Sequence, residues 1–369
     1  MANTPKRPPW TDKYKQNWDE SYKRVMAWWN FEDTDRPVLL NSYTKPVEER
    51  DSNLKWIGGA DPDEKRRIDI DLSVKMNNLR CVTENNRFIG DGVPGKNYSF
   101  GSDLGLLCVQ AGGTISYGNG TAWLNHEPDL YSREIPDIAS DCNVLDRIGE
   151  YIRKAHETYG YDIVLGANPM IDPLTTLSMM RGAAELNLDL VDDPDTVERW
   201  VKALGDHYMK AAEFYRSVRA ELGRREDLNW CGMWAPGDMD ALQCDFSTMI
   251  SPEMFRRFAL PEAEREAAFY DYSLWHLDGD DEFRHLDDIL AIPGLNGIQY
   301  VENKGKDPLE HMEIWEKIIG RKKCLTMWAS KESALEMTKH LGKKGLAFHI
   351  AGLQSEDAFY DYAKILERL

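Results

Sequence analysis

The sequence predicts an α/β protein in which one barrel is favoured over two separate domains. Short apolar segments alternate with longer helical patterns along most of the chain, and this alternation is typical of parallel strands with helices outside. A length of 369 residues suits either two domains or one barrel with insertions. Since neither a sequence repeat nor a low-complexity linker divides the chain, we expect a single domain over residues 1–369.

The elements are expected in the following order. Residues 1–20 should be a flexible or peripheral segment, and a helical pattern rich in aromatic and charged residues covers 11–35. A first strand follows at Val38–Leu40. Residues 41–135 are irregular and rich in glycine, as loops that shape a substrate pocket often are. Later strands are expected at 161–166, 228–234, 274–278, 298–301, 323–328 and 345–350, with helices at about 195–222 and 252–270.

Composition and charge exclude several classes of protein. The formal net charge of −18 opposes nonspecific binding to nucleic acid or to anionic membranes. The amino terminus has no apolar core of a signal peptide or membrane span. Six cysteines occur without a Cys-x-x-Cys pair, so reduced thiols are expected and a Cys₄ zinc site is not. No nucleotide-binding glycine motif is present. We therefore expect a soluble cytoplasmic protein that acts on a small molecule.

The most informative segment is Leu274–Gly279, a buried strand that ends in polar residues and a turn. His276 and Asp278 are two residues apart, and in an extended strand this spacing places both side chains on the same face. An imidazole and a carboxylate can then meet at one ion or substrate, at the carboxyl end of the strand where α/β enzymes place their chemistry. The alternative is that His276 is a hydrogen-bonded core residue and Asp278 a turn former.

Several segments, in the same order along the chain, resemble the uroporphyrinogen decarboxylase superfamily. The resemblance covers most of residues 20–369 and implies a TIM-type (β/α)₈ barrel with an elaborated amino-terminal region. Its motifs are Asp35-Arg36-Pro37-Val38, Phe100 to Gly113 with Thr121-Ala122-Trp123, Met180 to Leu186 with Asp192-Asp193-Pro194, Cys244 to Ser247 with Ile250 to Phe255 and Pro261, His276 to Gly279, and Ile292 to Gln299.

One departure from the family pattern bears on the substrate. The decarboxylases carry an Arg-Gln-Ala-Gly-Arg motif near the amino terminus that binds a substrate with many carboxylates, and residues 1–50 contain no such motif. A cleft without these guanidinium groups would lack bidentate partners for a polyanion. Uroporphyrinogen is therefore not the expected substrate, and the resemblance is closest to the zinc-dependent methyltransferases that work with corrinoid proteins.

In that branch the zinc ligands are a His-x-Cys pair on a late strand and a Cys on the last strand. His276 matches the first position, Asp278 stands at the second, and His349 lies near the third. Imidazole and carboxylate groups both ligate zinc and would leave a fourth position open. His349 is as readily a hydrogen-bond donor in the pocket. Cys244 and Cys324 are further candidate ligands, although each is more often a small buried residue.

The resemblance therefore implies a metal-dependent methyltransferase that moves a methyl group between a small substrate and cobalamin on a separate corrinoid protein. Ser247, Trp234 and Trp275 are the expected substrate-binding residues, and Asp245 and His349 the expected catalytic residues. The alternative is a decarboxylase of a small carboxylic acid in which Asp245 and His349 donate protons. A third class is a barrel that binds a ligand without turnover.

Overall fold

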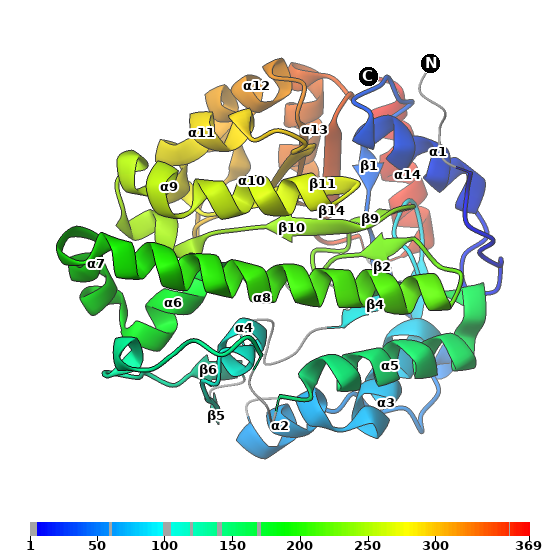
Figure 1. Ribbon diagram of the computed structural model, residues 1–369. Helices are drawn as coiled ribbons and strands as arrows, with labels where there is room; N and C mark the ends of the chain where they lie inside the picture. The colour runs from blue at the N-terminus through cyan, green and yellow to red at the C-terminus, as the bar shows by residue number, and fades with distance from the viewer. Residues whose placement is uncertain are drawn as a thin grey trace.

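A computed structural model describes residues 6–58, 61–98, 105–118, 121–138, 142–167, 171–353 and 355–369. Strands lie at the centre of the molecule and helices surround them (Figure 1). The largest sheet has six parallel strands. In spatial order they are β1 (Val38–Leu39), β14 (Leu346–Ile350), β13 (Cys324–Ala329), β12 (Gly297–Val301), β11 (Tyr272–Asp278) and β10 (Met239–Leu242). The first strand of the chain therefore pairs with the last.

A second parallel pair extends this arrangement. It consists of β4 (Gly95–Tyr98) and β7 (Val164–Ala167). The short strand β8 (Asp227–Leu228) contacts both β7 and β10, and it pairs with β9 (Trp234–Ala235) in an antiparallel hairpin. A Cβ atom at Gly166 would lie 1.8 Å from the carbonyl oxygen of Leu228, so only glycine allows the β7 and β8 backbones to approach this closely. Two further pairs of strands are antiparallel, β2 (Ser42–Thr44) with β3 (Asn86–Phe88) and β5 (Ile115–Gly118) with β6 (Thr121–Leu124).

The helices connect the strands and cover the outside of the sheet (Figure 1). The longest is α8 (Pro194–Glu221); proline occupies its first turn and the Asp193 side chain caps it by accepting from the Thr196 backbone N–H. The others are α1 (Trp18–Trp29), α2 (Pro62–Ile70), α3 (Leu72–Asn85), α4 (Leu106–Gln110), α5 (Val144–Tyr159), α6 (Pro173–Arg181), α7 (Ala183–Asp192), α9 (Pro252–Phe258), α10 (Leu260–Phe269), α11 (Leu286–Ala291), α12 (Met312–Gly320), α13 (Lys331–Leu341) and α14 (Glu356–Glu367). Within the described ranges, none combines the length and apolar character needed to cross a membrane.

In the described part of the amino-terminal segment, residues 6–20, two tryptophans pack into the core although most of their neighbours are exposed or half-buried. Trp10 and Trp18 are almost fully buried and stack with ring centroids 4.5 Å apart. The edge of Trp234, from β9, packs against the Trp10 ring at 5.3 Å. The α helix begins at Trp18 and not at residue 11, while the chain before it is held by aromatic packing.

Both faces of the main sheet are buried, and alternate residues of a strand pack in different hydrophobic cores. Leu274 of β11 packs in the core that contains the α1 tryptophans, whereas Trp275 and Leu277 pack against the surrounding helices. The period of two therefore sets His276 and Asp278 on the same face as Leu274, away from the helices. The expected shared face of these two residues is present.

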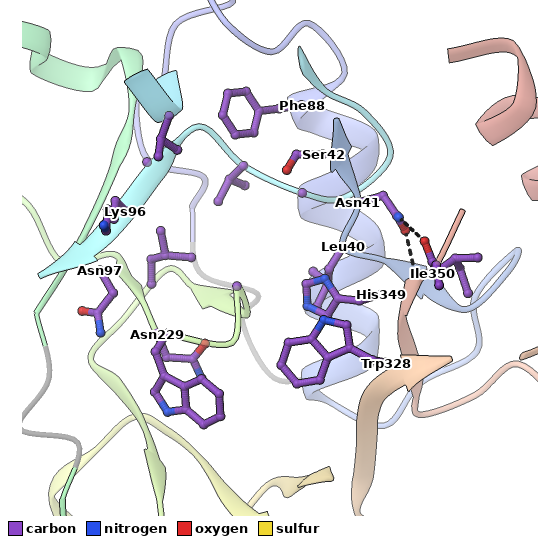
Figure 2. A pocket seen from close by; sticks show the side chains of 18 residues that line it. Leu40, Asn41, Ser42, Phe88, Lys96, Asn97, Asn229, Trp328, His349 and Ile350 are labelled. Carbon is purple, nitrogen blue, oxygen red and sulfur yellow. Dashed lines mark hydrogen bonds between the residues drawn. The ribbon is translucent and has the colours of Figure 1, made fainter. Parts of the chain in front are cut away.

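A cavity of about 550 Å³ lies at the carboxyl ends of β1, β8, β13 and β14 and beside β4 (Figure 2). Asn97 of β4 and Asn229, just after β8, lie on one side of it, and Trp328 and His349 lie on the other. Carboxyl ends of parallel strands are where α/β folds bind ligands. This cavity is therefore the candidate site.

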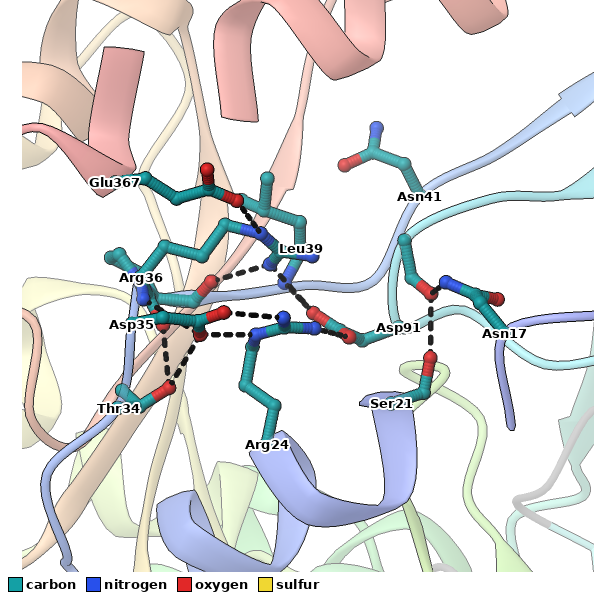
Figure 3. Close-up of polar contacts among 12 residues, drawn as sticks. Asn17, Ser21, Arg24, Thr34, Asp35, Arg36, Leu39, Asn41, Asp91 and Glu367 are labelled. Carbon is teal, nitrogen blue, oxygen red and sulfur yellow. Dashed lines mark hydrogen bonds and ion pairs between the residues drawn. The ribbon is translucent and has the colours of Figure 1, made fainter. Parts of the chain in front are cut away.

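A buried carboxylate fixes the chain next to this cavity (Figure 3). Asp91 is fully buried, and its two oxygens accept hydrogen bonds from Arg24 of α1 at 2.6 Å and from Arg36 at 2.8 Å. It also accepts from the backbone N–H of Leu39 in β1. Burial opposes ionisation of Asp91, but the charges of Arg36 and Arg24 outweigh it and lower its pKa.

Replacing Asp91 with alanine should lower the free energy of unfolding by about 3–5 kcal/mol, because Arg24 and Arg36 are then left buried without their shared partner. Denaturant unfolding followed by circular dichroism measures the change. The matched control is Glu157→Gln, which breaks an exposed ion pair with Lys154 and should cost less than about 1 kcal/mol. Equal losses in the two variants would contradict the role given to Asp91.

Candidate functional site

His349 forms part of the cavity wall near the end of β14. Its Nε2–H donates a hydrogen bond to the carbonyl oxygen of Cys231 at 2.7 Å. Because a carbonyl only accepts, Nε2 carries the proton, and Nδ1 is left as the nitrogen with a lone pair. The Trp328 ring stacks on the imidazole with centroids 5.0 Å apart and planes 18° from parallel. His349 is thus oriented by one hydrogen bond and one aromatic contact.

His276 lies deeper on the same face of the sheet, on β11. Its Nδ1 is hydrogen-bonded to Oε1 of Gln299, its register partner on β12. The Gln299 amide is oriented by its own Nε2–H, which donates to the carbonyl oxygen of Tyr300 at 2.9 Å. Gln299 therefore presents an acceptor, His276 donates from Nδ1, and its Nε2 is left as the lone-pair nitrogen. The Trp230 ring meets His276 edge-on, with centroids 4.8 Å apart.

Both imidazoles are neutral at physiological pH. Burial lowers the pKa of His349 to about 4, although the hydrogen bond to Cys231 opposes this shift. Burial also lowers the pKa of His276, while the hydrogen bond with Gln299 and the charge of Asp278 act in the opposite direction. Neutral imidazoles offer a ligand hydrogen-bonding groups without a positive charge.

The expected zinc ligands are not brought together. Asp278 is the last residue of β11 and is exposed. The Nε2 of His349 is engaged by the Cys231 carbonyl. Within the described ranges, no three His, Cys, Asp or Glu side chains form a group that could hold a metal ion. His276 has a free Nε2 and a second-sphere partner of the kind that metal-ligating histidines use, but as placed His276, Asp278 and His349 do not fit a three-ligand zinc centre.

The two cysteines considered as ligands are both buried. The Cys324 thiol donates a hydrogen bond to the carbonyl oxygen of Trp28 at 2.7 Å, within the core beneath the sheet. Cys244 is almost fully buried, and burial raises the pKa of its thiol far above the ordinary value, with the nearby Asp172 charge acting in the same direction. Thiols in such surroundings are inert, which agrees with the structural interpretation of both residues.

Asp245 and Ser247 lie together in the 3₁₀ helix Asp245–Met249 that follows β10. Burial raises the pKa of Asp245 to about 7, and the charges of Asp172 and Asp278 act in the same direction. Ser247 is fully buried, and its backbone carbonyl accepts a hydrogen bond from His285 at 2.9 Å. Neither residue is part of the wall of the cavity that contains His349.

Trp234 and Trp275, which we expected to bind substrate, are core residues. Trp234 is fully buried, and its Nε1–H donates to the carbonyl oxygen of Asp91 at 2.8 Å. Trp275 points toward the helices and packs edge-on against Phe255 with centroids 5.9 Å apart. Both tryptophans belong to strands expected from the sequence. Trp275 faces the helices, on the side of the sheet opposite the cavity, and Trp234 faces the core beneath the cavity.

Four residues of the cavity wall were not among the site residues predicted from the sequence. Asn41 follows β1 and joins it to β14, because its Nδ2–H donates to the Ile350 carbonyl oxygen at 2.9 Å. Asn229 and Trp230 follow β8, and Trp328 lies near the end of β13. Two of them had a signal in their position, since Asn41 follows and Trp328 ends a strand expected from the sequence. Asn229 and Trp230 lie at the start of the strand expected over 228–234, which is instead the hairpin of β8 and β9.

Comparisons with known proteins bear on the fold. Neither a protein-family model nor a curated protein sequence matches this chain. A solved structure described as a methyltransferase from Methanosarcina mazei is similar, with a TM-score of 0.60 at 17% sequence identity. The similarity covers 95% of this chain and 98% of that chain. The two proteins therefore share an overall fold along nearly their entire lengths.

The pKa of His349 makes a prediction about pH. The folded imidazole takes up a proton near pH 4, whereas in the unfolded chain it does so near 6.5. Between these values the unfolded state binds more protons, so stability falls as the pH is lowered from about 6.5 to 4. In His349→Gln this fall should be smaller. Proton NMR of the ring, assigned with the same variant, should show no titration near 6.5; a midpoint there would contradict the assignment.

The placement of the three expected ligands makes a prediction about metal content. Protein from zinc-supplemented cultures should carry the same amount of zinc in the unmutated form and in His349→Gln, because His349 is bonded to Cys231 and stands apart from any ligand group. Any zinc bound through β11 should instead fall in His276→Ala and Asp278→Ala. Elemental analysis measures zinc per chain. If His349→Gln lost stoichiometric zinc, this result would contradict the prediction and support a zinc site formed by His276, Asp278 and His349.

Proposed function

We propose that this protein is a methyltransferase of the uroporphyrinogen decarboxylase superfamily. It moves a methyl group between a small substrate held in the cavity of Figure 2 and a corrinoid cofactor carried by a separate protein. The observation that carries the proposal is the structural similarity to the methyltransferase from Methanosarcina mazei over 95% of this chain. The collinear family motifs of the sequence point to the same superfamily.

The proposal includes closure of the strands into a TIM-type barrel. Three observations support it. β1 pairs with β14, which brings the first strand beside the last. β8 contacts both β7 and β10, so it bridges the main sheet and the β4–β7 pair. The Asp91 backbone N–H donates to the Leu39 carbonyl oxygen at 2.8 Å, which links the chain just before β4 to β1. These are the contacts that a closed ring of strands would require.

A reduced corrinoid, when bound, supplies the nucleophile that accepts the methyl group. The part of this chain is to hold the methyl donor near the mouth and to supply hydrogen-bond donors to the heteroatom that the methyl group leaves. That heteroatom keeps the bonding electron pair and takes up a proton. The Asn229 amide and the Trp230 indole suit this task, because their buried N–H groups have no acceptor in the described part of the chain and they bind a polar group without adding charge. His349, whose one N–H is bonded to Cys231, offers an acceptor nitrogen instead.

The second candidate function is the decarboxylation of a small carboxylic acid. It is favoured by Asp245, because a carboxyl group whose pKa is raised to about 7 retains a proton to donate near neutral pH. Its Oδ1 is buried and has no hydrogen-bond partner in the described part of the chain. Against this candidate, Asp245 is absent from the wall of the cavity around His349, so the two proposed proton donors do not share one pocket.

The proposed function is tested with free cob(I)alamin as acceptor and a panel of methyl ethers, methylamines and methyl thioethers as donors. We expect a donor-dependent change to the methylcobalamin spectrum. His349→Gln should lower the rate at least about tenfold, because His349 lines the cavity and one misplaced group near a reacting centre commonly costs that much. The control is Trp123→Leu, an exposed tryptophan outside the cavity. Release of CO₂ from small acids that is lost in Asp245→Asn, without methyl transfer, would favour the lyase instead.

A further inference from the structure

The walls of the cavity are unusually aromatic for a small-molecule site. Trp328 lies at 36% exposure on the wall, and His349 stacks on it. Trp230 approaches from the opposite loop with its ring 23° from parallel to Trp328 and centroids 6.4 Å apart. Phe88 adds a fourth ring. Aromatic rings prefer offset-stacked or edge-on partners at centroid distances of about 4.5–7 Å, so a planar ring would extend the aromatic packing already present.

Charge is nearly absent from this wall. Of the described residues that line the cavity, Lys96 alone carries a formal charge, and none is a carboxylate. The Lys96 ammonium lies 4.3 Å from the centroid of the Trp56 ring, and Trp56 is not part of the cavity wall. His349, the histidine of this wall, is neutral. A cationic ligand would find no carboxylate partner, and a polyanion no cluster of guanidinium groups, so the cavity suits an uncharged ligand.

Two buried donors on the wall have no acceptor among the described residues, namely Asn229 Nδ2 and Trp230 Nε1. Asn229 is 2% exposed. The carbonyl oxygen of its amide is already occupied, since it accepts from the Met233 backbone N–H and the Cys231 thiol, both at 3.0 Å. The amide is therefore held in one orientation and its N–H₂ group remains. Buried donors are normally paired, so a ligand that fits here brings acceptor oxygens.

We infer that the cavity binds an uncharged aromatic ring bearing oxygen acceptors, with an aryl methyl ether as the form that is turned over. The turnover part rests on the proposed function; the binding part does not. In the reaction the carbon–oxygen bond of the methoxy group breaks and the methyl group passes to the reduced corrinoid. The oxygen keeps the electron pair and takes up a proton to give a phenol. The ring packs with Trp328 and Trp230, and an oxygen accepts from Asn229 or Trp230.

Isothermal titration calorimetry of the full chain, without corrinoid, tests the binding part. The probes are 1,2-dimethoxybenzene, its saturated counterpart 1,2-dimethoxycyclohexane, and the tetramethylammonium ion. We expect the aromatic ether to bind at least about tenfold more tightly than either of the others, because only it has both the planar ring and the oxygens. Equal affinity for the saturated ether, preference for the cation, or no binding of the aromatic ether would each overturn the inference.

Variants locate the binding to this cavity. Trp328→Leu should weaken binding of 1,2-dimethoxybenzene by about five- to tenfold, and Trp328→Phe should restore most of it, because a ring face is what the ligand uses. Trp123→Leu is the matched control: it removes another exposed indole, which lies outside the cavity, and should leave the affinity unchanged. Unchanged binding in Trp328→Leu would overturn the inference.

Methyl transfer separates this inference from the proposed function. Binding of 1,2-dimethoxybenzene together with no methyl transfer to cob(I)alamin from any donor of the panel would leave the aromatic site standing and remove the proposed function. Transfer from a methylamine or an aliphatic ether, together with no binding of the aromatic ether, would keep the proposed function and overturn the aromatic substrate class.

Discussion

The buried carboxylate of Asp91 is the interaction on which the site depends. Removing a carboxylate from water is costly unless its partners are close and complete, and here Arg24, Arg36 and the Leu39 backbone N–H supply them. These partners come from α1, the chain before β1, and β1 itself. The backbone carbonyl of Asp91 in addition accepts from Trp234 in β9. Asp91 thus joins four segments of the chain. Gly92, which follows Asp91, and Leu40, which follows Leu39, line the cavity.

The contrast between the charged protein and its uncharged cavity has a physical explanation. The chain carries a formal charge of −18. Many of the charged groups with buried side chains form ion pairs with each other, such as Arg24 with Asp91 and Arg224 with Glu226. On the wall, burial favours the neutral form of His349, which leaves Lys96 as the charged residue among the described residues there. Recognition in this cavity therefore relies on ring faces and on hydrogen-bond donors of fixed orientation.

The metal-site hypothesis shows how far strand periodicity reaches. The two-residue spacing of His276 and Asp278 correctly places both side chains on one face of β11. Whether three such residues meet depends on rotamers and on competing partners, and the carbonyl of Cys231 binds Nε2 of His349 from a loop more than a hundred positions away. Gln299 binds Nδ1 of His276 in the same way from the next strand. Neither competitor has a signature in the sequence around the histidine that it binds.

From residue 161 onward the sequence by itself indicated the alternation of strands and helices, since apolar periodicity and flanking polar residues are local properties. It correctly predicted strands near 38–40, 274–278, 298–301, 323–328 and 345–350, but residues 41–135, expected to be irregular, contain helices α2, α3 and α4 and strand β4. Only the tertiary structure decided which indoles are core and which are wall. Trp234 and Trp275 lie within buried strands and pack in the core, whereas Trp230 and Trp328 lie at or beyond strand ends and face the cavity. The physical reason is that burial and the pairing of polar atoms depend on segments distant in the sequence, and these meet only when the strands are assembled.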